Sequence, residues 1–381
     1  MTSVTWSWKE IEIPTPIGCI RGKLWFNFPE LEDIETGIAD VIDSQVQVPP
    51  RQVNGSASSR VTADEQGHED RFVALHGWQD NCGTFDRLIP LLLTTTPDDE
   101  MRDEQSNSSR ISNHQKVTIA AIDLPGHGLS SHYPMGTFYT DLAFAIDLKR
   151  VIHHLGWDSF SLLGHSMGGY VSIIYASLFP NQVKRVITLD ILKPLTFDTD
   201  QLPNHFAKSI DSFLTIECKV NRKGAKVPVY TKSEAVDRLL KGHSKIGNLS
   251  RQSAVILLKR GSKPVTPIDE GYSDPKPNGS SELAEEDHVV FTRDPRLQAI
   301  FFSRMDATTV KAYLKKLQCQ MYVIKARNGI KLDEEDVNRD FISLYSSVCK
   351  SFKLIEVEGE HHVHLCDPDA VAHAIDNILS S

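Results

Sequence analysis

The chain has 381 residues, of which 40% are hydrophobic and 24% are charged, and its formal net charge is −9. This composition is typical of a globular protein with one large domain and an inserted subdomain. No apolar run approaches the roughly 20 residues of a membrane span, so we expect no membrane-spanning helix. With no basic cluster in the sequence, we expect neither nucleic acid nor a membrane surface as a partner.

The N-terminal region alternates between a strand pattern and polar stretches. Residues 11–28 alternate in polarity and turn at 14–18, which predicts a β-hairpin. The segments 36–70 and 95–115 are rich in polar and acidic residues, and we expect both to be mobile loop insertions. The first residues lack the basic and apolar regions of a signal peptide. Six cysteines without paired spacing indicate reduced thiols. We therefore expect a cytoplasmic protein, with the peroxisome as the alternative.

Short apolar strands and amphipathic helices alternate along most of the chain. This order predicts βαβ units and a mostly parallel sheet flanked by helices, which is an α/β fold. The expected strands are 71–75, 117–123, 159–163, 183–190, 320–326 and 352–357, and the clearest helices are 85–92, 141–155, 334–348 and 369–379.

From about 193 to 313 the pattern changes to short helices and loops, interrupted by a polar tract at 264–287. Because this block interrupts the strand–helix alternation, we expect a helical cap over the sheet. The core domain would then comprise 1–192 and 314–381.

The strand at 159–163 leads directly into Gly164-His165-Ser166-Met167-Gly168, which has the form G-x-S-x-G. A helical pattern follows at once. A serine on a sharp turn between a strand and a helix is the nucleophile elbow, in which the serine hydroxyl stands exposed at the carboxyl end of the sheet. The alternative is a tight glycine turn with a solvated serine. We expect Ser166 to be a nucleophile.

A serine hydroxyl needs a base, and the histidines after the last predicted strand are the candidates. His361 comes first after the strand, at the same sheet edge as Ser166, and we expect it to be the base. His364 precedes Leu365 and is expected to pack beneath the loop. Two alternatives are a metal site formed by His361, His362 and His364, and a purely structural loop histidine. We expect no metal.

The acid that orients the histidine has two candidates. Asp190 ends an apolar strand at the carboxyl edge, where an unpaired carboxylate would be costly to bury, so a histidine partner would explain it. Asp333 is the alternative, but it lies among acidic residues that also fit a helix start. Both satisfy the chain order Ser, Asp, His. The burial argument favours Asp190.

Two backbone N–H groups are expected to stabilise the oxyanion. One is that of Met167, at the start of the helix after the serine, and the other is that of Trp78, in the loop after the first core strand. Asp80 and Asn81 in that loop are expected to cap the next helix.

Several motifs resemble the α/β-hydrolase superfamily and, within it, the serine hydrolase-like group. They are LHGWQDN at 75–81, DLPGHG at 123–128, GHSMGG at 164–169, FTRDPRL at 291–297, IKA at 324–326 and H-x-x-H-L at 361–365. The resemblance implies an α/β-hydrolase fold with a helical cap, a Ser166 nucleophile, a His361 base and no cofactor. Many members carry the acid shortly after the strand at 320–326, but residues 326–329 here contain no carboxylate. Relatives with the acid after the strand that follows the elbow have a spacing like that of Asp190.

These observations predict a serine hydrolase that cleaves a carboxylic ester, thioester or amide of a small to medium apolar substrate through an acyl-enzyme on Ser166. The partner would be a small-molecule substrate, and the sequence carries no signal of an oligomeric state. The alternative is a non-catalytic receptor that binds a small molecule on the same scaffold, because a fold by itself does not fix a function.

Overall fold

The computed structural model describes residues 6–28, 69–94, 116–244, 246–265, 288–299, 305–332 and 334–379. The predicted loop insertions at 36–70 and 95–115 lie outside this part of the chain, except for Glu69 and Asp70. These two residues begin a strand and do not belong to a loop, which corrects that boundary. The polar tract at 264–287 also lies outside, except for Pro264 and Val265.

The core of the described structure is an eight-stranded sheet with the strand order β1-β2-β4-β3-β5-β6-β10-β11. The hairpin strands β1 and β2 pair antiparallel, as does β2 with β4, and all other pairs are parallel. The predicted hairpin and mostly parallel sheet are thereby confirmed. The strands are β1 (Ser7–Thr15), β2 (Gly18–Phe26), β3 (Glu69–Leu75), β4 (Lys116–Ile122), β5 (Phe160–His165), β6 (Val183–Leu189), β10 (Gln320–Asn328) and β11 (Ser351–Glu360).

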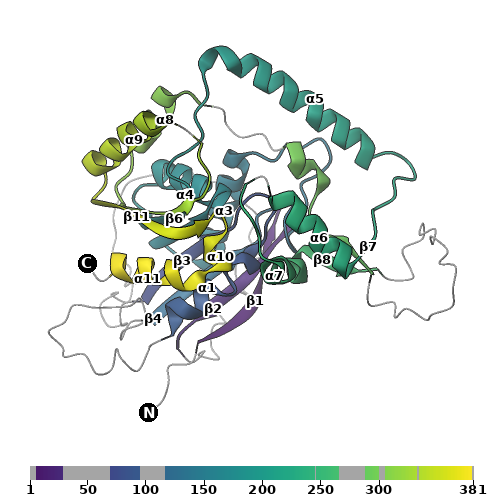
Figure 1. The fold of residues 1–381 in the computed structure, drawn as a ribbon, viewed down its shortest axis with the longest axis horizontal. Helices are drawn as coiled ribbons and strands as arrows, with labels where there is room; N and C mark the ends of the chain where they lie inside the picture. The colour runs from purple at the N-terminus through teal and green to yellow at the C-terminus, as the bar shows by residue number, and fades with distance from the viewer. Residues whose placement is uncertain are drawn as a thin grey trace, which may run out of the picture.

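Helices cover both faces of the sheet, which explains why its central strands are continuous apolar runs. On one face, α3 (Asp141–Leu155), α4 (Met167–Leu178), α8 (Ala307–Leu314) and α9 (Glu335–Val348) contribute to the larger core cluster. On the other face, α1 (Leu88–Leu93) and α11 (Pro368–Leu379) contribute to a second cluster. In Figure 1, α8 and α9 lie together at the upper left, and α1 and α11 lie together lower in the view. In the described part of the chain, no helix has the length and apolar character needed to cross a membrane.

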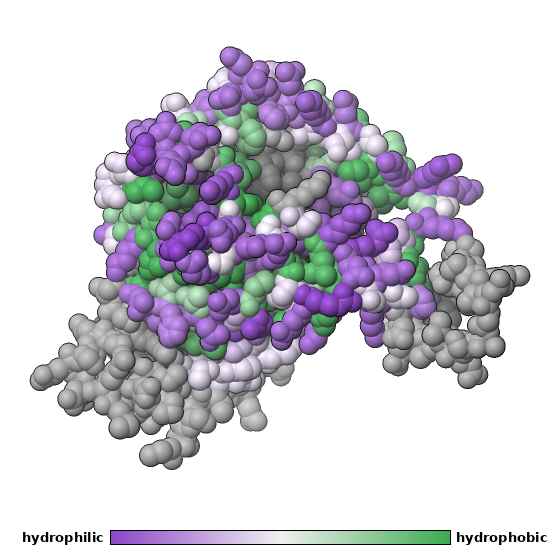
Figure 2. All heavy atoms as spheres, viewed as in Figure 1, coloured by the Kyte–Doolittle hydropathy of each residue, from purple (hydrophilic) through white to green (hydrophobic). Residues whose placement is uncertain are grey.

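Residues 193–313 form an insertion between β6 and β10. Its elements are η4 (Thr199–Gln201), α5 (Leu202–Val220), β7 (Tyr230–Thr231), α6 (Lys232–His243), α7 (Arg251–Gly261), β8 (Ser262–Pro264), β9 (His288–Phe291), η6 (Pro295–Ala299) and α8. The three strands make a small antiparallel sheet, which the expectation of helices and loops alone missed. Hydrophilic side chains cover α5 at the top of Figure 2, and hydrophobic ones gather below it.

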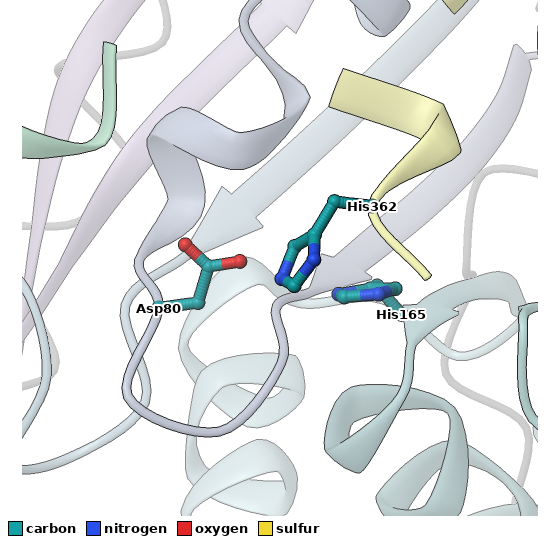
Figure 3. A group of neighbouring side chains, drawn as sticks. All are labelled: Asp80, His165 and His362. Atoms are coloured by element: carbon teal, nitrogen blue, oxygen red, sulfur yellow. The ribbon is translucent and has the colours of Figure 1, made fainter. Parts of the chain in front are cut away.

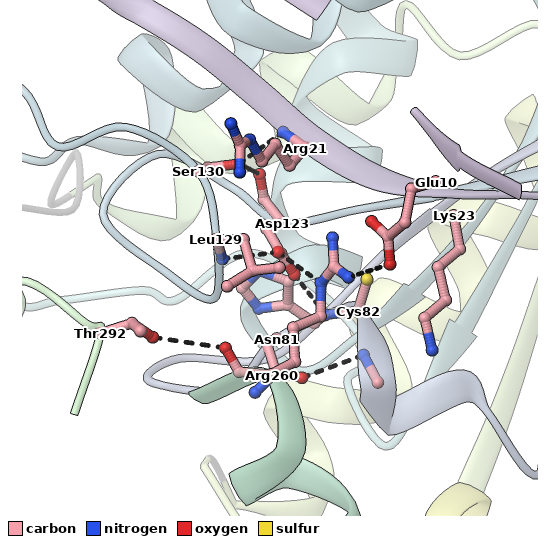
Figure 4. Close-up of polar contacts among 12 residues, drawn as sticks. Glu10, Arg21, Lys23, Asn81, Cys82, Asp123, Leu129, Ser130, Arg260 and Thr292 are labelled. Atoms are coloured by element: carbon pink, nitrogen blue, oxygen red, sulfur yellow. Dashed lines mark hydrogen bonds and ion pairs between the residues drawn. The ribbon is translucent and has the colours of Figure 1, made fainter. Parts of the chain in front are cut away.

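One buried ion pair joins the insertion to the core, and a second pair within the insertion is hydrogen-bonded to core residues. The Nε of Arg260, at the end of α7, donates to Asp123 Oδ2 at 2.6 Å, and its other arm reaches Glu10 of β1 (Figure 4). Asp123 also accepts from the backbone N–H groups of Cys82 and Leu129. The DLPGHG motif at 123–128 therefore contains an anchor for the insertion.

The second pair lies next to the η6 segment. Asp294 and Arg296 form a buried ion pair, with Nη2 to Oδ2 at 2.7 Å. The hydroxyl of Tyr139 donates to the same carboxylate, and the backbone N–H of Asp294 donates to the carbonyl of Gly126. Core and insertion are thus joined by hydrogen bonds to buried charged groups, and each of these groups has a partner of opposite charge, as burial of charge requires.

Candidate active site

Ser166 lies between β5 and α4 in a backbone conformation that few side chains adopt, with φ 49° and ψ −113°. The strand and helix approach closely around it. A Cβ on Gly164 would lie 2.5 Å from backbone atoms of Gly168, and one on Gly168 would lie 2.0 Å from the carbonyl oxygen of Leu75. Only glycine fits at these two positions, which is why the pattern G-x-S-x-G produces this turn. The predicted strand–turn–helix is present.

His361 follows β11 and Asp190 follows β6, and the structure brings these two side chains together. The Nδ1 of His361 lies 2.6 Å from Oδ2 of Asp190, and both side chains are buried. Because a carboxylate accepts, Nδ1 carries the proton that makes this bond, and Nε2 is left as the ring's free acceptor. The alternative acid, Asp333, lies outside the described residues.

The carboxylate of Asp190 has a complete set of donors. Its Oδ1 accepts from Lys325 Nζ at 2.5 Å and from the backbone N–H of Ala326, and its Oδ2 accepts from the backbone N–H of Ile330. A Cβ on Gly329 would lie 2.2 Å from Oδ1, so glycine makes room for the carboxylate. The segment 326–329, which lacks an acid of its own, thus surrounds the acid supplied by another strand.

This environment controls the charge of Asp190. Burial by itself would raise the pKa of the carboxyl, but the hydrogen bond from His361 and the positive charge of Lys325 outweigh burial. The pKa of Asp190 is therefore lowered, and the group is an anion at neutral pH. A negative charge at this point stabilises a positive charge on the His361 ring.

Ser166 and His361 line one pocket with a volume of about 160 Å³. Trp78 and Met167, the two predicted oxyanion donors, line it as well. The side chain of Trp78 donates through Nε1 to the carbonyl of Leu297, which fixes its loop against the insertion. The remaining lining residues are largely apolar and come from core and insertion: Gly77, His165, Tyr170, Ile191, Leu195, Ile246, Ile330, Leu332 and His362.

His364 is fully buried, with its Nε2 2.8 Å from the hydroxyl of Thr84, and does not line the pocket. This agrees with its expected packing beneath the loop. Asn81 caps the η3 helix (Cys82–Phe85) by accepting from the N–H of Gly83, as expected. Asp80 does not, because its Oδ1 accepts from the N–H of Asn81 instead.

Sequence reasoning missed three contributors to the site. Lys325 directly follows the apolar run 321–324 of its strand, and a charge at such a place is a signal that a buried partner exists. His165 and His362, neighbours of Ser166 and His361, both reach the pocket. Burial, followed by the repulsion of neighbouring histidines, lowers the pKa of both, so they are neutral rings.

The comparisons with known proteins agree with this geometry. Residues 70–215 match the family model described as the alpha/beta hydrolase fold. The chain is 33% identical to a Drosophila melanogaster protein named "Probable serine hydrolase", over 84% of each chain. It is 32% identical to the "Serine hydrolase-like protein" of Danio rerio, over 82% of each chain.

Solved structures share the fold. A hypothetical protein of Pseudomonas aeruginosa aligns with a TM-score of 0.64 and 24% identity, covering 98% of each chain. The thioesterase domain of the curacin biosynthetic pathway aligns with a TM-score of 0.62 and 18% identity, covering 98% of this chain and 100% of that one. Together with the sequence relatives, these findings show that the chain belongs to the α/β-hydrolase superfamily, in its serine hydrolase-like group.

Proposed function

We propose that this protein cleaves a carboxylic ester, thioester or amide of a small to medium apolar acid through an acyl-enzyme on Ser166. One observation carries the proposal. A serine on a strained elbow and a histidine hydrogen-bonded to a buried carboxylate line the same pocket. These are the groups that an acyl transfer needs, in the roles of nucleophile, base and orienting acid.

The proposed reaction begins when His361 Nε2 takes the proton of the Ser166 hydroxyl as Oγ attacks the carbonyl carbon. The oxyanion accepts hydrogen bonds from the backbone N–H groups of Met167 and Trp78. His361 then gives its proton to the leaving group, and the acyl-enzyme forms. In the second half, His361 takes a proton from water, which attacks the ester, and Ser166 is released with its proton restored. Asp190 holds the ring and stabilises its charged form throughout.

The pocket lining supports an apolar acyl group. Tyr170 and Ile191 come from the core, and Leu195 and Ile246 come from the insertion. We propose that the insertion acts as the cap that shapes this acyl site. A volume of about 160 Å³ suits a small to medium chain better than a long one.

The test is labelling with a fluorophosphonate, which reacts with activated serines. The wild-type protein should be labelled with one equivalent, and Ser166→Ala should abolish both labelling and turnover of a short-chain ester. Ser177→Ala is the matched control, because Ser177 is a serine of the same helix whose hydroxyl donates to the carbonyl of Ile173. It should retain labelling. Absence of labelling in the folded wild type would refute the proposal.

The receptor alternative predicts a different time course. A receptor that reacts once would release a stoichiometric burst of alcohol from a model ester and then stop. A hydrolase continues to turn over after the burst, because water removes the acyl group. The bond between His361 Nδ1 and Asp190 favours turnover, because it places the ring proton on Nδ1 and leaves Nε2 as the acceptor for the second proton transfer.

A further inference from the structure

A second group of polar side chains lies next to the pocket. Asp80 follows β3, His165 ends β5 and His362 begins the short helix α10 (Val363–Cys366). One potential ligand atom of each residue lies within 4.8 Å of those of the other two. All three side chains are buried, and Figure 3 shows them directed toward a common point. Neither His361 nor His364 belongs to this group.

The hydrogen bonds of these residues leave one buried polar atom of each residue without a partner in the described part of the chain. His165 Nε2 lies 3.0 Å from the carbonyl oxygen of His361, so Nε2 carries the proton and Nδ1 bears a lone pair. Asp80 uses Oδ1 for the N–H of Asn81. Asp80 Oδ2, His165 Nδ1 and His362 Nδ1 are buried and have no hydrogen-bond partner among the described residues.

Unsatisfied buried polar atoms are rare in folded proteins, because leaving such a group without a hydrogen bond destabilises the folded state. His165 Nδ1 is an acceptor, Asp80 Oδ2 is one when the carboxyl is ionised, and His362 Nδ1 is one in the tautomer with its proton on Nε2. A cation can serve all three. The bond from His165 Nε2–H to a backbone carbonyl is also the arrangement that orients a metal-binding imidazole through its other nitrogen.

We propose that Asp80, His165 and His362 form an inhibitory binding site for one divalent transition metal ion of the zinc type. Two imidazoles and one carboxylate favour Zn²⁺, Co²⁺ or Cu²⁺ over Mg²⁺ and Ca²⁺, which prefer oxygen ligands. Tetrahedral ligands around zinc are roughly 3.4 Å apart. The group is somewhat wider than this, so small side-chain rotations close it around the ion.

The position of the site explains why occupation would inhibit. The ion enters from the pocket, because His165 and His362 line it. Asp80 shares a loop with Trp78, His165 precedes Ser166, and His362 follows His361. One ion therefore links the three segments that carry the oxyanion donor, the nucleophile and the base. The inhibition rests on the proposed function, whereas metal binding does not.

The first experiment measures binding of the metal alone to the full chain. Titration with Zn²⁺ should show one ion per chain at micromolar concentration, and Co²⁺ should give the absorption bands of a tetrahedral site. Asp80→Asn and His362→Gln should each weaken the affinity at least about tenfold. The matched control is His132→Gln, which removes an exposed histidine that contacts Asp294 and should leave the affinity unchanged.

Three results would overturn the site: no stoichiometric binding by the wild type, octahedral Co²⁺ bands, or equal affinity in all variants. The Co²⁺ spectrum needs no variant, so a variant that fails to fold does not prevent the test.

A second experiment addresses inhibition. Ser166→Ala should bind Zn²⁺ like the wild type while being inactive, and Zn²⁺ should reduce wild-type turnover in proportion to occupancy. Full occupancy without loss of turnover would refute the inhibitory role alone, and an inactive wild type that binds Zn²⁺ would refute only the proposed hydrolase.

Discussion

Two regions of this molecule each bury a carboxylate at the carboxyl end of a parallel strand. The two carboxylates differ in the basic side chain with which each is paired. Asp190 follows β6 and faces His361, and Asp123 follows β4 and faces Arg260. Both carboxylates also accept backbone N–H bonds. A guanidinium stays protonated at any ordinary pH, whereas an imidazole gains and loses a proton near neutrality. The same buried arrangement therefore holds the insertion in one place and, under the proposed function, serves proton transfer in the other.

The largest expected effect comes from neutralising the carboxylate beside the histidine. Asp190→Asn should lower turnover of a model ester by about 10⁴, because the amide favours the wrong tautomer of His361 and no longer stabilises its charge. The fold should persist, as judged by circular dichroism. Asp333→Asn is the control, and it should retain activity. If Asp333→Asn is instead the damaging change, the acid is misassigned.

Removing the cation that pairs with Asp123 should lower the stability of the folded protein. Arg260→Met should lower the free energy of unfolding by about 3–5 kcal/mol, because Asp123 is left as a buried charge without its cation. Guanidinium denaturation measures this change. The matched control is Arg251→Met on the same helix, whose pair with Asp237 is exposed and should be worth less than about 1 kcal/mol. Equal effects of the two substitutions would show that the buried pair does not anchor the insertion.

A third substitution moves the carboxylate of Asp190 without changing its charge, and so tests how strictly its position matters. Gly329→Ala places a methyl group against Asp190 and should lower turnover by roughly 100-fold, the loss expected when a catalytic group moves by about 1 Å. Gly242→Ala is the control, because a Cβ there meets nothing within 4 Å. An active Gly329→Ala enzyme would mean that the exact position of Asp190 matters little.

The smallest effect is a pH dependence at the second ion pair. Burial would raise the pKa of Asp294, but hydrogen bonds from Arg296 and Tyr139 outweigh it and lower the pKa below its usual 3.8. A lowered folded-state pKa stabilises the protein above the unfolded value and loses that contribution as the pH falls through the folded value. The stability difference between wild type and Asp294→Asn should therefore be constant above about pH 5 and shrink below 3.8. Thermal unfolding at a series of pH values measures it, and a difference that grows on acidification would contradict the pairing.

Local sequence determined the sheet and the elbow. The hairpin, the alternation of apolar strands with helices, and the glycines around Ser166 follow from backbone sterics and side-chain periodicity, which act over short distances. The choice of Asp190 as the histidine partner also came from the sequence, through the cost of burying a lone carboxylate. The three-stranded sheet in the insertion was missed, because its strands β7 and β8 have only two and three residues.

Only the tertiary structure decided which distant residues meet. Lys325 and Gly329 lie beside Asp190, Arg260 reaches Asp123 across 137 positions, and Asp80 joins His165 and His362. No local pattern encodes these contacts, because the crossovers of a parallel sheet bring the carboxyl ends of separate strands to one edge. The sequence predicts the candidate reactive groups, and the packing of that edge determines which buried charges neutralise one another.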